Sequence, residues 1–325
     1  DVENGFVTSI VPKGEGIGKP LVPPFVDIHI HGGYGVDIMN SSSSEIIYLS
    51  KKLYENNVGA YMPTTVAKSY SKILASAKEI KYASKNNNYA EILGIHIEGP
   101  FISKEYKGIM EESYITPCNI KLYEDLKNIM GDLKIRFTIA PECEGAYEFC
   151  KYVTDNGDFI SIGHSGASVS ECKELINNGA SSYTHLFNAM SPVNHRNMGV
   201  AGAGIIDNNF VEVICDFVHI DKECIELITK LKEDKIILIT DAMEAMGCEI
   251  GAYVFCGTNV VVNENSVRDN TGRLAGSILT MNKAVENMTK IVGLESAIKM
   301  ASENPSKLLG LSKYGYIDVG RRIII

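Results

Sequence analysis

A regular alternation of short apolar runs with helix-like segments constrains the fold most strongly. From Phe25 onward, eight runs rich in β-branched and aromatic residues have the composition of buried strands, and segments of helical periodicity separate them. The runs cover residues 25–31, 58–65, 92–98, 135–141, 159–164, 181–185, 211–217 and 236–241. An open, doubly wound sheet rarely repeats so evenly. The pattern therefore predicts an α/β protein built on a (β/α)8 TIM-type barrel.

Helix boundaries between these runs support the same architecture. Ser42-x-x-Glu45 and Ser168-x-x-Glu171 are capping boxes, in which the serine and the glutamate satisfy backbone groups at the start of a helix. They predict helices that begin after Ser42 and Ser168. A further amphipathic pattern predicts a helix over residues 281–291, after the eighth strand.

Segments of β character flank the barrel at both ends of the chain. Residues 5–11 and 316–319 have strand-like patterns and lie on opposite sides of the predicted barrel in sequence. We expect residues 1–24 and 313–325 to form a small β domain, incomplete or partly absent from this chain. The barrel would then cover residues 25–312, with residues 247–272 inserted after strand eight as a β-hairpin.

Charge and cysteine usage narrow the choice of partners and compartment. The net charge is −9 over 325 residues, with acidic and basic residues interspersed, which argues against a nucleic-acid partner or an anionic membrane partner. The eight cysteines contain no Cys-x-x-Cys pair, so they predict reduced thiols and a cytoplasmic protein. No apolar run reaches the roughly 18 residues of a membrane helix, and the first residues do not resemble a signal peptide.

The first barrel strand carries an unusual polar face. Val26, Ile28 and Ile30 alternate with Asp27, His29 and His31, so the three polar side chains share one side of the strand. Residues two apart on a strand are about 7 Å apart, which lets two imidazoles share one metal ion. Taken alone, the pair is explained equally well by buried, hydrogen-bonded histidines.

Metal-ligating residue types collect where the strands end. The chain has seven histidines, and five of them lie at predicted strand ends. The active site of a (β/α)8 barrel lies at the carboxyl ends of its strands, so side chains there converge. Imidazole and carboxylate groups that converge are suited to zinc or iron(II). The residues at these ends are His29, His31, His96, Glu98, His164, His185 and Asp241.

Their order along the chain suggests roles. Glu98, His164 and His185 would form one three-ligand site with an open position for water. His29 and His31 would hold a second metal, with Glu98 able to bridge the two ions. Asp241 is placed to take a proton from the attacking water and return it to a leaving group. We therefore predict one or two divalent ions, zinc or iron.

Five motifs carry a family resemblance. They are Gly94–Phe101 (GIHIEGPF), Ser161–Ser165 (SIGHS), Thr184–Met190 (THLFNAM), Thr240–Met243 (TDAM) and Leu274–Met281 (LAGSILTM). In this order they resemble the N-acetylglucosamine-6-phosphate deacetylases of the amidohydrolase superfamily. The resemblance spans about residues 25–310.

The resemblance implies a reaction and a metal site. Hydroxide would attack the acetamide carbonyl, the metal and a nearby histidine would polarise the carbonyl oxygen, and Asp241 would protonate the departing amine. The products would be glucosamine 6-phosphate and acetate. Glu98, His164 and His185 match the tightly held metal site of the family. The histidine pair of strand one occurs in some members only.

The resemblance also implies substrate contacts and an assembly. Asn188 and Ala189 would bind the substrate through the loop, and His219 would contact the sugar. His195 and Arg196 match the segment that grips the phosphate, in some members across the interface of a homodimer. A guanidinium also suits a phosphate by its fork geometry.

Other functions fit the sequence less well. Another amidohydrolase could act on a different N-acyl sugar or a cyclic amide, or could be a deaminase. Cyclic-amide relatives often use a modified lysine at strand four, which here ends Ala140-Pro141-Glu142. Deaminases usually lack the glutamate of strand three. A barrel that had lost activity and acts as a binding protein need not keep ligands at five strand ends.

Two departures from the family pattern concern substrate choice and the small domain. Ile109-Met110 stand where the family commonly places Ala followed by His or Gln, so one polar substrate contact is expected to be missing. Pro23-Pro24 replace the usual Pro-Gly before the first strand.

Overall fold

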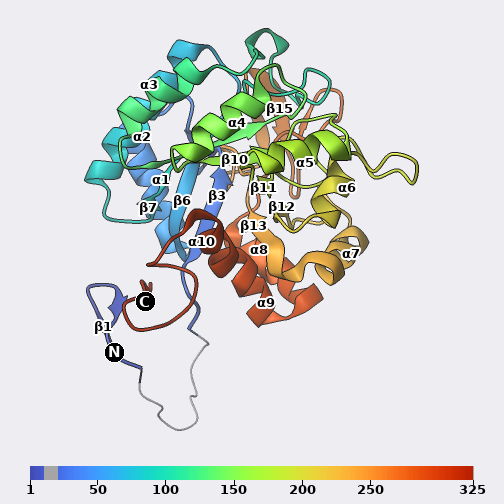
Figure 1. The fold of residues 1–325 in the computed structure, drawn as a ribbon. Helices are drawn as coiled ribbons and strands as arrows, with labels where there is room; N and C mark the ends of the chain where they lie inside the picture. The colour runs from blue at the N-terminus through green and yellow to red at the C-terminus, as the bar shows by residue number, and fades with distance from the viewer. Residues whose placement is uncertain (11–20, 325) are drawn as a thin grey trace.

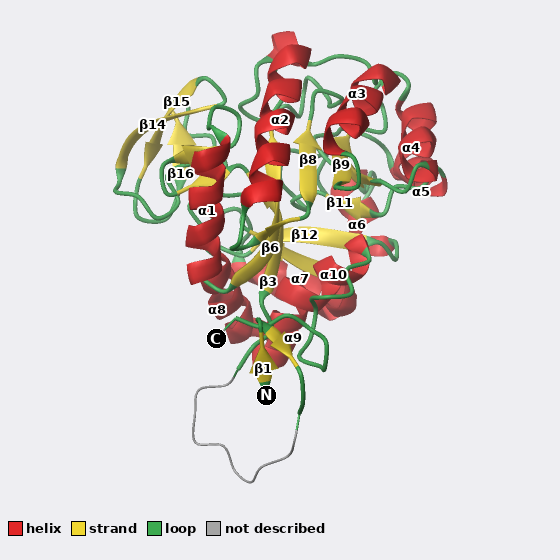
Figure 2. Cartoon of the chain, turned by 90° about the vertical axis from the view of Figure 1, so that its left-hand side faces the viewer, coloured by secondary structure: helices red, strands yellow, loops and turns green. Residues whose placement is uncertain are grey.

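A computed structural model describes residues 1–10 and 21–324 as a mixed α/β structure. Within these residues, eight parallel strands stand side by side in sequence order and form a nearly closed barrel (Figures 1 and 2), which confirms the predicted fold class. The barrel strands are β3 (Phe25–Ile30), β6 (Val58–Thr65), β8 (Gly94–Glu98), β9 (Lys134–Ile139), β10 (Phe159–Ile162), β11 (Ser182–Tyr183), β12 (Phe210–Ile214) and β13 (Ile236–Ile239).

Hydrogen bonds between the first and last strands bring the barrel edges together. The Asp241 N–H donates to the His29 carbonyl at 2.9 Å, and the His31 N–H donates to the Ala242 carbonyl at 2.8 Å. The Thr240 hydroxyl donates to the buried Asp27 carboxylate at 2.6 Å. The same bonds hold the ends of β3 and β13, and the polar residues on them, at one place.

Helices form the outer layer around the strands, as Figure 2 shows. α1 illustrates why they form: the Glu45 carboxylate accepts from the Ser42 N–H at 2.7 Å, and Ile46, Leu49 and Leu53 turn one apolar face to the barrel. The helices that follow the strands are α1 (Ser43–Glu55), α2 (Tyr70–Asn86), α3 (Ile120–Met130), α4 (Ala146–Asp155), α5 (Val169–Asn177), α6 (Gly199–Ile206), α7 (Lys222–Lys232) and α8 (Met281–Val292).

Several strands are shorter than predicted, for a common backbone reason. The predicted runs extend to His164, His185, Phe217 and Asp241, but each strand ends two or three residues earlier. All four residues have positive φ angles, between 30° and 62°. A left-handed conformation cannot continue a strand, so the chain turns at these positions.

Small antiparallel β units are attached to the barrel. The insert after strand eight contains the antiparallel pair β14 (Gly251–Phe255) and β15 (Thr258–Val262), and a third strand, β16 (Val267–Asp269), that the sequence did not predict. Two further short strands, β4 (Gly32–Gly33) and β5 (Val36–Asp37), follow β3 as a hairpin. Phe255 packs edge-on against the His31 ring at 5.4 Å, so the insert reaches the carboxyl end of the barrel.

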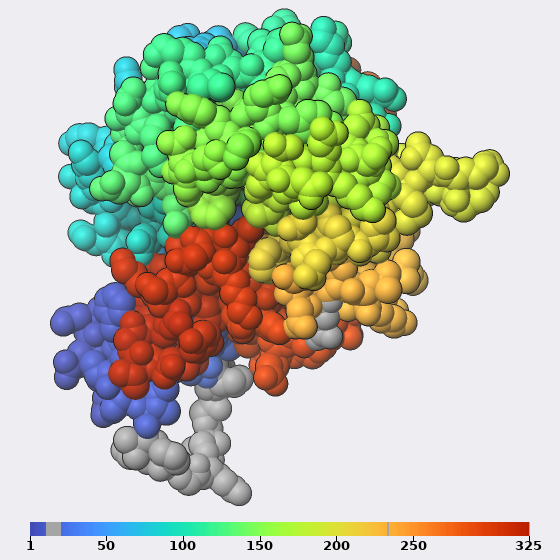
Figure 3. Space-filling view, in the orientation of Figure 1, coloured from blue at the N-terminus to red at the C-terminus, as the bar shows by residue number. Residues whose placement is uncertain are grey.

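The two chain ends lie side by side at the foot of the barrel (Figures 1 and 3). β1 (Val2–Glu3) pairs with β2 (Phe6–Val7), and the Val7 N–H donates to the Arg321 carbonyl at 2.9 Å. The strand predicted at residues 316–319 is absent from the described chain, and residues 320–323 make the pairing instead. The predicted N-terminal strand ends at Val11, which lies outside the described residues. The same holds for all of residues 11–20 and for residue 325 of the predicted β domain.

The remaining described elements are short. Over residues 1–10 and 21–324, no helix has the length and apolar character needed to cross a membrane. The short elements are β7 (Glu91–Ile92), the 3-10 turns η1 (Glu112–Tyr114) and η2 (Glu233–Lys235), α9 (Leu294–Ile298), the π-helical segment η3 (Lys299–Glu303) and α10 (Asn304–Leu309).

Candidate active site

Six predicted site residues from five strands meet at the carboxyl end of the barrel. Glu98 is the last residue of β8, and His29 and His31 lie in and just after β3. The other three lie two residues beyond β10, β11 and β13 respectively. None of the six is more than 8% exposed. The six are His29, His31, Glu98, His164, His185 and Asp241.

The backbone at three of these positions is in a conformation that non-glycine residues rarely adopt. The φ angles are 49° at His164, 30° at His185 and 49° at Asp241. Each such residue costs on the order of 1–3 kcal/mol, which the surrounding structure must supply. The turns direct the side chains from the strand ends to a common centre instead of along the sheet.

Glu98, His164 and His185 form the first group of converging ligand atoms. Glu98 Oε1 lies 3.1 Å from His164 Nε2 and 3.0 Å from His185 Nε2, and the two nitrogens are 3.1 Å apart. Zinc–nitrogen bonds are about 2.0–2.1 Å long, so two ligands of a tetrahedral zinc lie roughly 3.3 Å apart. The observed spacing therefore suits a divalent cation.

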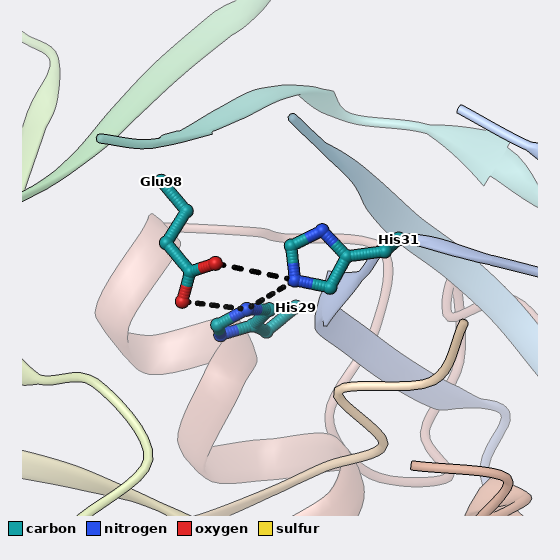
Figure 4. A group of neighbouring side chains, drawn as sticks. All are labelled: His29, His31 and Glu98. Carbon is teal, nitrogen blue, oxygen red and sulfur yellow. Dashed lines mark hydrogen bonds and ion pairs between the residues drawn. The ribbon is translucent and has the colours of Figure 1, made fainter. Parts of the chain in front are cut away.

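His29 and His31 form a second group with the same glutamate (Figure 4). Glu98 Oε2 lies 3.3 Å from His31 Nε2, and Glu98 Oε1 lies 3.4 Å from His29 Nε2. The two imidazole Nε2 atoms are 3.3 Å apart. Since Glu98 uses both oxygens and belongs to both groups, it is placed to bridge two ions.

Asp241 lines the cavity and contacts both histidines of this pair. Its Oδ1 is 3.1 Å from His31 Nε2 and 3.3 Å from His29 Nε2. Burial raises the pKa of Asp241, but the two imidazoles outweigh it and hold the pKa below its ordinary value. The side chain is therefore a carboxylate at neutral pH, able to accept a proton.

The electrostatics of the cluster favour positive charge. Burial lowers the pKa of His31, but Asp241 and Glu98 outweigh it and raise the pKa to about 10. The pKa of His185 rises to about 9, since Glu98 outweighs burial in the same way. A pocket that pulls protons onto its imidazoles so strongly is equally suited to hold a cation in their place.

Hydrogen-bond acceptors stand behind three of the four imidazoles. His31 Nδ1 lies 3.3 Å from the Thr64 carbonyl, and His164 Nδ1 lies 2.7 Å from the Tyr106 carbonyl. His29 Nδ1 faces the Glu212 carboxylate at 3.2 Å. Such contacts fix which ring nitrogen carries the proton and leave Nε2 free to bind a metal.

A cavity of about 700 Å³ opens above the cluster. Of the predicted substrate contacts, Asn188, Ala189 and His219 line it. His195 and Arg196 do not: they are exposed on the loop between β11 and α6, which projects from the body of the molecule (Figures 1 and 3). One chain thus brings its predicted sugar-contact residues, but not its predicted phosphate residues, to the cavity.

His219 is held in the cavity wall by a neighbouring acid. Its Nδ1 lies 2.6 Å from Asp216 Oδ2, and Asp216 also accepts the backbone N–H of His219 at 2.8 Å. This pairing leaves Nε2 of His219 as the free ring nitrogen. The imidazole can therefore present a polar atom to a ligand.

The rest of the cavity wall consists of loop residues for which the sequence predicted no role. Tyr106 and Met110 come from the loop after β8, Phe255 and Arg268 come from the insert, and Arg273 directly follows the insert. Met110, noted as a departure from the family pattern, thus lies in the cavity wall. No strand end or fixed spacing marks such residues in a sequence, because loops reach a site only through the folded chain.

Two buried charges inside the barrel were also missed. Arg136 on β9 and Glu212 on β12 are both fully buried and form an ion pair. A charge within an otherwise apolar strand was the available signal, since Arg136 lies in KIRFTI and Glu212 in FVEVI. Alternation along a barrel strand points such residues to the interior.

Comparison with known proteins agrees with this geometry. Residues 21–323 match the amidohydrolase family. The chain belongs to the amidohydrolase family. The family resemblance of the five motifs is therefore confirmed.

Relatives of this amidohydrolase carry deacetylase names. It is 37% identical over 274 residues to the N-acetylglucosamine-6-phosphate deacetylase of Bacillus subtilis, covering 82% of the chain and 69% of that protein. It is 32% identical to an N-acetylgalactosamine-6-phosphate deacetylase of Escherichia coli, covering 88% of the chain and 78% of that protein.

Solved structures show the same fold. The amidohydrolase superposes on N-acetylglucosamine-6-phosphate deacetylase from Thermotoga maritima with a TM-score of 0.90 at 33% identity, covering 99% of this chain and 88% of that one. The enzyme of the same name from Pasteurella multocida gives a TM-score of 0.91 at 29% identity, with the same coverage.

Proposed function

We propose that this amidohydrolase removes the acetyl group from N-acetylglucosamine 6-phosphate and yields glucosamine 6-phosphate and acetate. The observation that carries the proposal is the convergence of Glu98, His164, His185 and Asp241 at the floor of a cavity large enough for a sugar phosphate. The names of its relatives supply the substrate class.

The cluster would hold one or two divalent ions, zinc or iron. Glu98, His164 and His185 are the ligands proposed for the first ion, and His29, His31 and Glu98 for the second. A divalent metal in such a site polarises a carbonyl oxygen and lowers the pKa of water. The choice between zinc and iron rests on the donor set, since both accept imidazole and carboxylate ligands.

Asp241 is proposed as the proton carrier. As a carboxylate at the edge of the cavity, it can accept the proton of the attacking water. It then gives this proton to the amide nitrogen, so that the amine leaves in neutral form. Its two histidine neighbours stay within 3.3 Å of Oδ1 and keep the carboxylate aimed at the reacting atoms.

Substrate binding would use residues of the cavity wall and a second copy of the chain. His219 would bind a sugar hydroxyl or the carbonyl oxygen, and Asn188 and Ala189 would contact the sugar through their loop. His195 and Arg196 are exposed on a projecting loop, which supports their reaching the phosphate in the cavity of a partner subunit. We therefore propose a homodimer.

The proposed setting is the cytoplasm, where the free cysteines of the described chain would stay reduced. We also propose the division of the chain into a barrel, residues 25–312, and a small β domain from residues 1–24 and 313–325. The hydrogen bond from the Ile323 N–H to the Gly5 carbonyl, 2.9 Å, supports the pairing of the two ends.

Acetate release tests the function directly. Purified protein loaded with zinc or iron is given N-acetylglucosamine 6-phosphate, N-acetylgalactosamine 6-phosphate and unphosphorylated N-acetylglucosamine. We expect the highest kcat/KM with the first sugar and loss of activity after chelation, restored by the metal. Preference for the galactosamine epimer would reassign the substrate. Full metal content without acetate release from any of the sugars would favour a binding protein.

A further inference from the structure

A buried ion pair inside the barrel, Arg136 with Glu212, has no role in the proposed reaction so far. Both side chains are completely inaccessible to solvent, and they face one another from β9 and β12. Arg136 Nη2 also donates to the Ser182 hydroxyl at 3.2 Å, but its Nε and Nη1 have no hydrogen-bond partner among the described residues. Buried charges with unmet hydrogen bonds are costly, so stability alone is a weak reason to keep this pair.

Glu212 connects this pair to the candidate metal site. Its Oε2 lies 3.2 Å from His29 Nδ1 and also accepts the backbone N–H of His185 at 3.3 Å. Arg136 pairs with the same carboxylate from β9. Glu212 thus contacts the guanidinium of Arg136 and the Nδ1 side of the His29 imidazole.

No other candidate ligand in the described chain has a carboxylate behind it. His31 and His164 meet backbone carbonyls, and Nδ1 of His185 has no partner among the described residues. A carboxylate that accepts the Nδ1 proton fixes the tautomer and raises the basicity of the free Nε2 more than a carbonyl does. The strongest hydrogen-bond acceptor behind any of these imidazoles therefore lies at His29. This residue belongs only to the second group, with His31 and Glu98.

We propose that Glu212, held by Arg136, is the positioning residue that turns His29, His31 and Glu98 into a true second metal site. The inference rests on the proposed metal centre and deepens it. Glu212 accepts the Nδ1 proton of a neutral His29, so that the lone pair of Nε2 points to Glu98. Arg136, paired with the same carboxylate, keeps Glu212 in this orientation. The first site, with Glu98, His164 and His185, does not need this support.

Zinc titration of the metal-free full-length protein tests the proposal without any sugar. By calorimetry and competition with a chromophoric chelator, we expect two equivalents in the wild type. In Glu212→Gln, which keeps the side-chain volume and an acceptor for the His185 N–H, we expect the second equivalent to bind about 10- to 100-fold more weakly. The first equivalent should bind as in the wild type.

Two controls separate positioning from folding. Ser182→Ala removes a hydrogen bond from Arg136 but touches no imidazole, so both zinc equivalents should be unchanged. The double variant Arg136→Met with Glu212→Gln removes the buried charges together. It should keep the melting temperature nearer to that of the wild type than Glu212→Gln alone does, yet still bind the second zinc weakly.

Three outcomes would overturn the proposal. They are a wild type that binds one equivalent only, a Glu212→Gln variant that binds both equivalents as the wild type does, and a double variant in which strong second-site binding returns. Acetate release by the wild type is measured separately. A wrong substrate therefore leaves this test intact, and a failed second site leaves the deacetylase assignment intact.

Discussion

The strand ends and the loops of this amidohydrolase contribute differently to the same cavity. At the strand ends, the residues Glu98, His164 and Asp241 are at most 8% exposed, and neighbouring strands fix their positions. The loops supply Arg273, directly after the insert, and Arg196 from the projecting segment, and both are exposed. The rigid region is suited to chemistry and the exposed region to recognition of an anion.

This difference predicts which kinetic constant each region controls. A change at a strand end should lower kcat, because it removes an interaction made in the transition state. A change in a loop should raise KM, because it removes binding energy that substrate and transition state share. Four variants test that separation.

Asp241→Asn should have the largest effect. The amide cannot accept or return the proton, so kcat for acetate release should fall by about 10²- to 10⁴-fold. Zinc content, measured by atomic emission, should stay as in the wild type, because the proposed ligands remain. Near-normal turnover would remove Asp241 from its role as the proton carrier.

Gly163→Ala tests whether strand-end geometry matters apart from any functional group. An added Cβ would lie 2.7 Å from the Thr184 Cβ and 2.8 Å from the Thr138 Cγ2, so β10 and the adjacent His164 must shift. We expect a loss of about 1–3 kcal/mol of stability. We also expect a decrease of roughly 10²-fold in kcat. A change in KM alone would contradict the assignment of chemistry to this region.

Arg196→Ala tests the loop region. The loss of a charged hydrogen bond of about 1.5–3 kcal/mol should raise KM for the phosphorylated sugar roughly 10- to 100-fold, with kcat little changed. Activity on the unphosphorylated sugar should not change. Lys151→Ala removes an exposed cation from α4 and serves as the control. Equal losses on both sugars would mean that the phosphate is held elsewhere.

The smallest effect concerns Asp216, which orients His219. Burial raises the pKa of Asp216, but the hydrogen bond to His219 outweighs it, so the folded-state pKa lies below the ordinary value. The resulting stability is present above about pH 4 and is lost as the pH falls through the folded-state pKa. Thermal melts should therefore show Asp216→Asn less stable than the wild type at pH 7, with a gap that narrows toward pH 3.

The barrel and the site motifs could be predicted together, because the same strand pattern that predicts the barrel also predicts where each strand ends. Apolar runs must alternate with helices to bury a parallel sheet, and the polar residue that ends each run then lies at the catalytic face. His164 and His185 could be located in this way before any coordinates. The same reasoning could not show that the strands stop short of them, because left-handed turns at histidine have no composition signal.

Other parts of the site depend on contacts between distant segments. Glu212 and His29 are 183 residues apart, and nothing local in either strand indicates that they meet. For the same reason the third strand of the insert was not predicted, and the C-terminal strand was expected at residues 316–319, whereas residues 320–323 pair with the N-terminal segment. Short segments of β character gain their structure from their partners, and propensity alone does not select among these.

The left-handed turns at His164, His185 and Asp241 have a consequence for protein engineering. Glycine or asparagine would adopt these angles at less cost, so substitution at these three positions could increase the free energy of unfolding. A search for heat-resistant variants would favour replacements at these three places. Each gain in thermal tolerance there would be made at the expense of the enzyme.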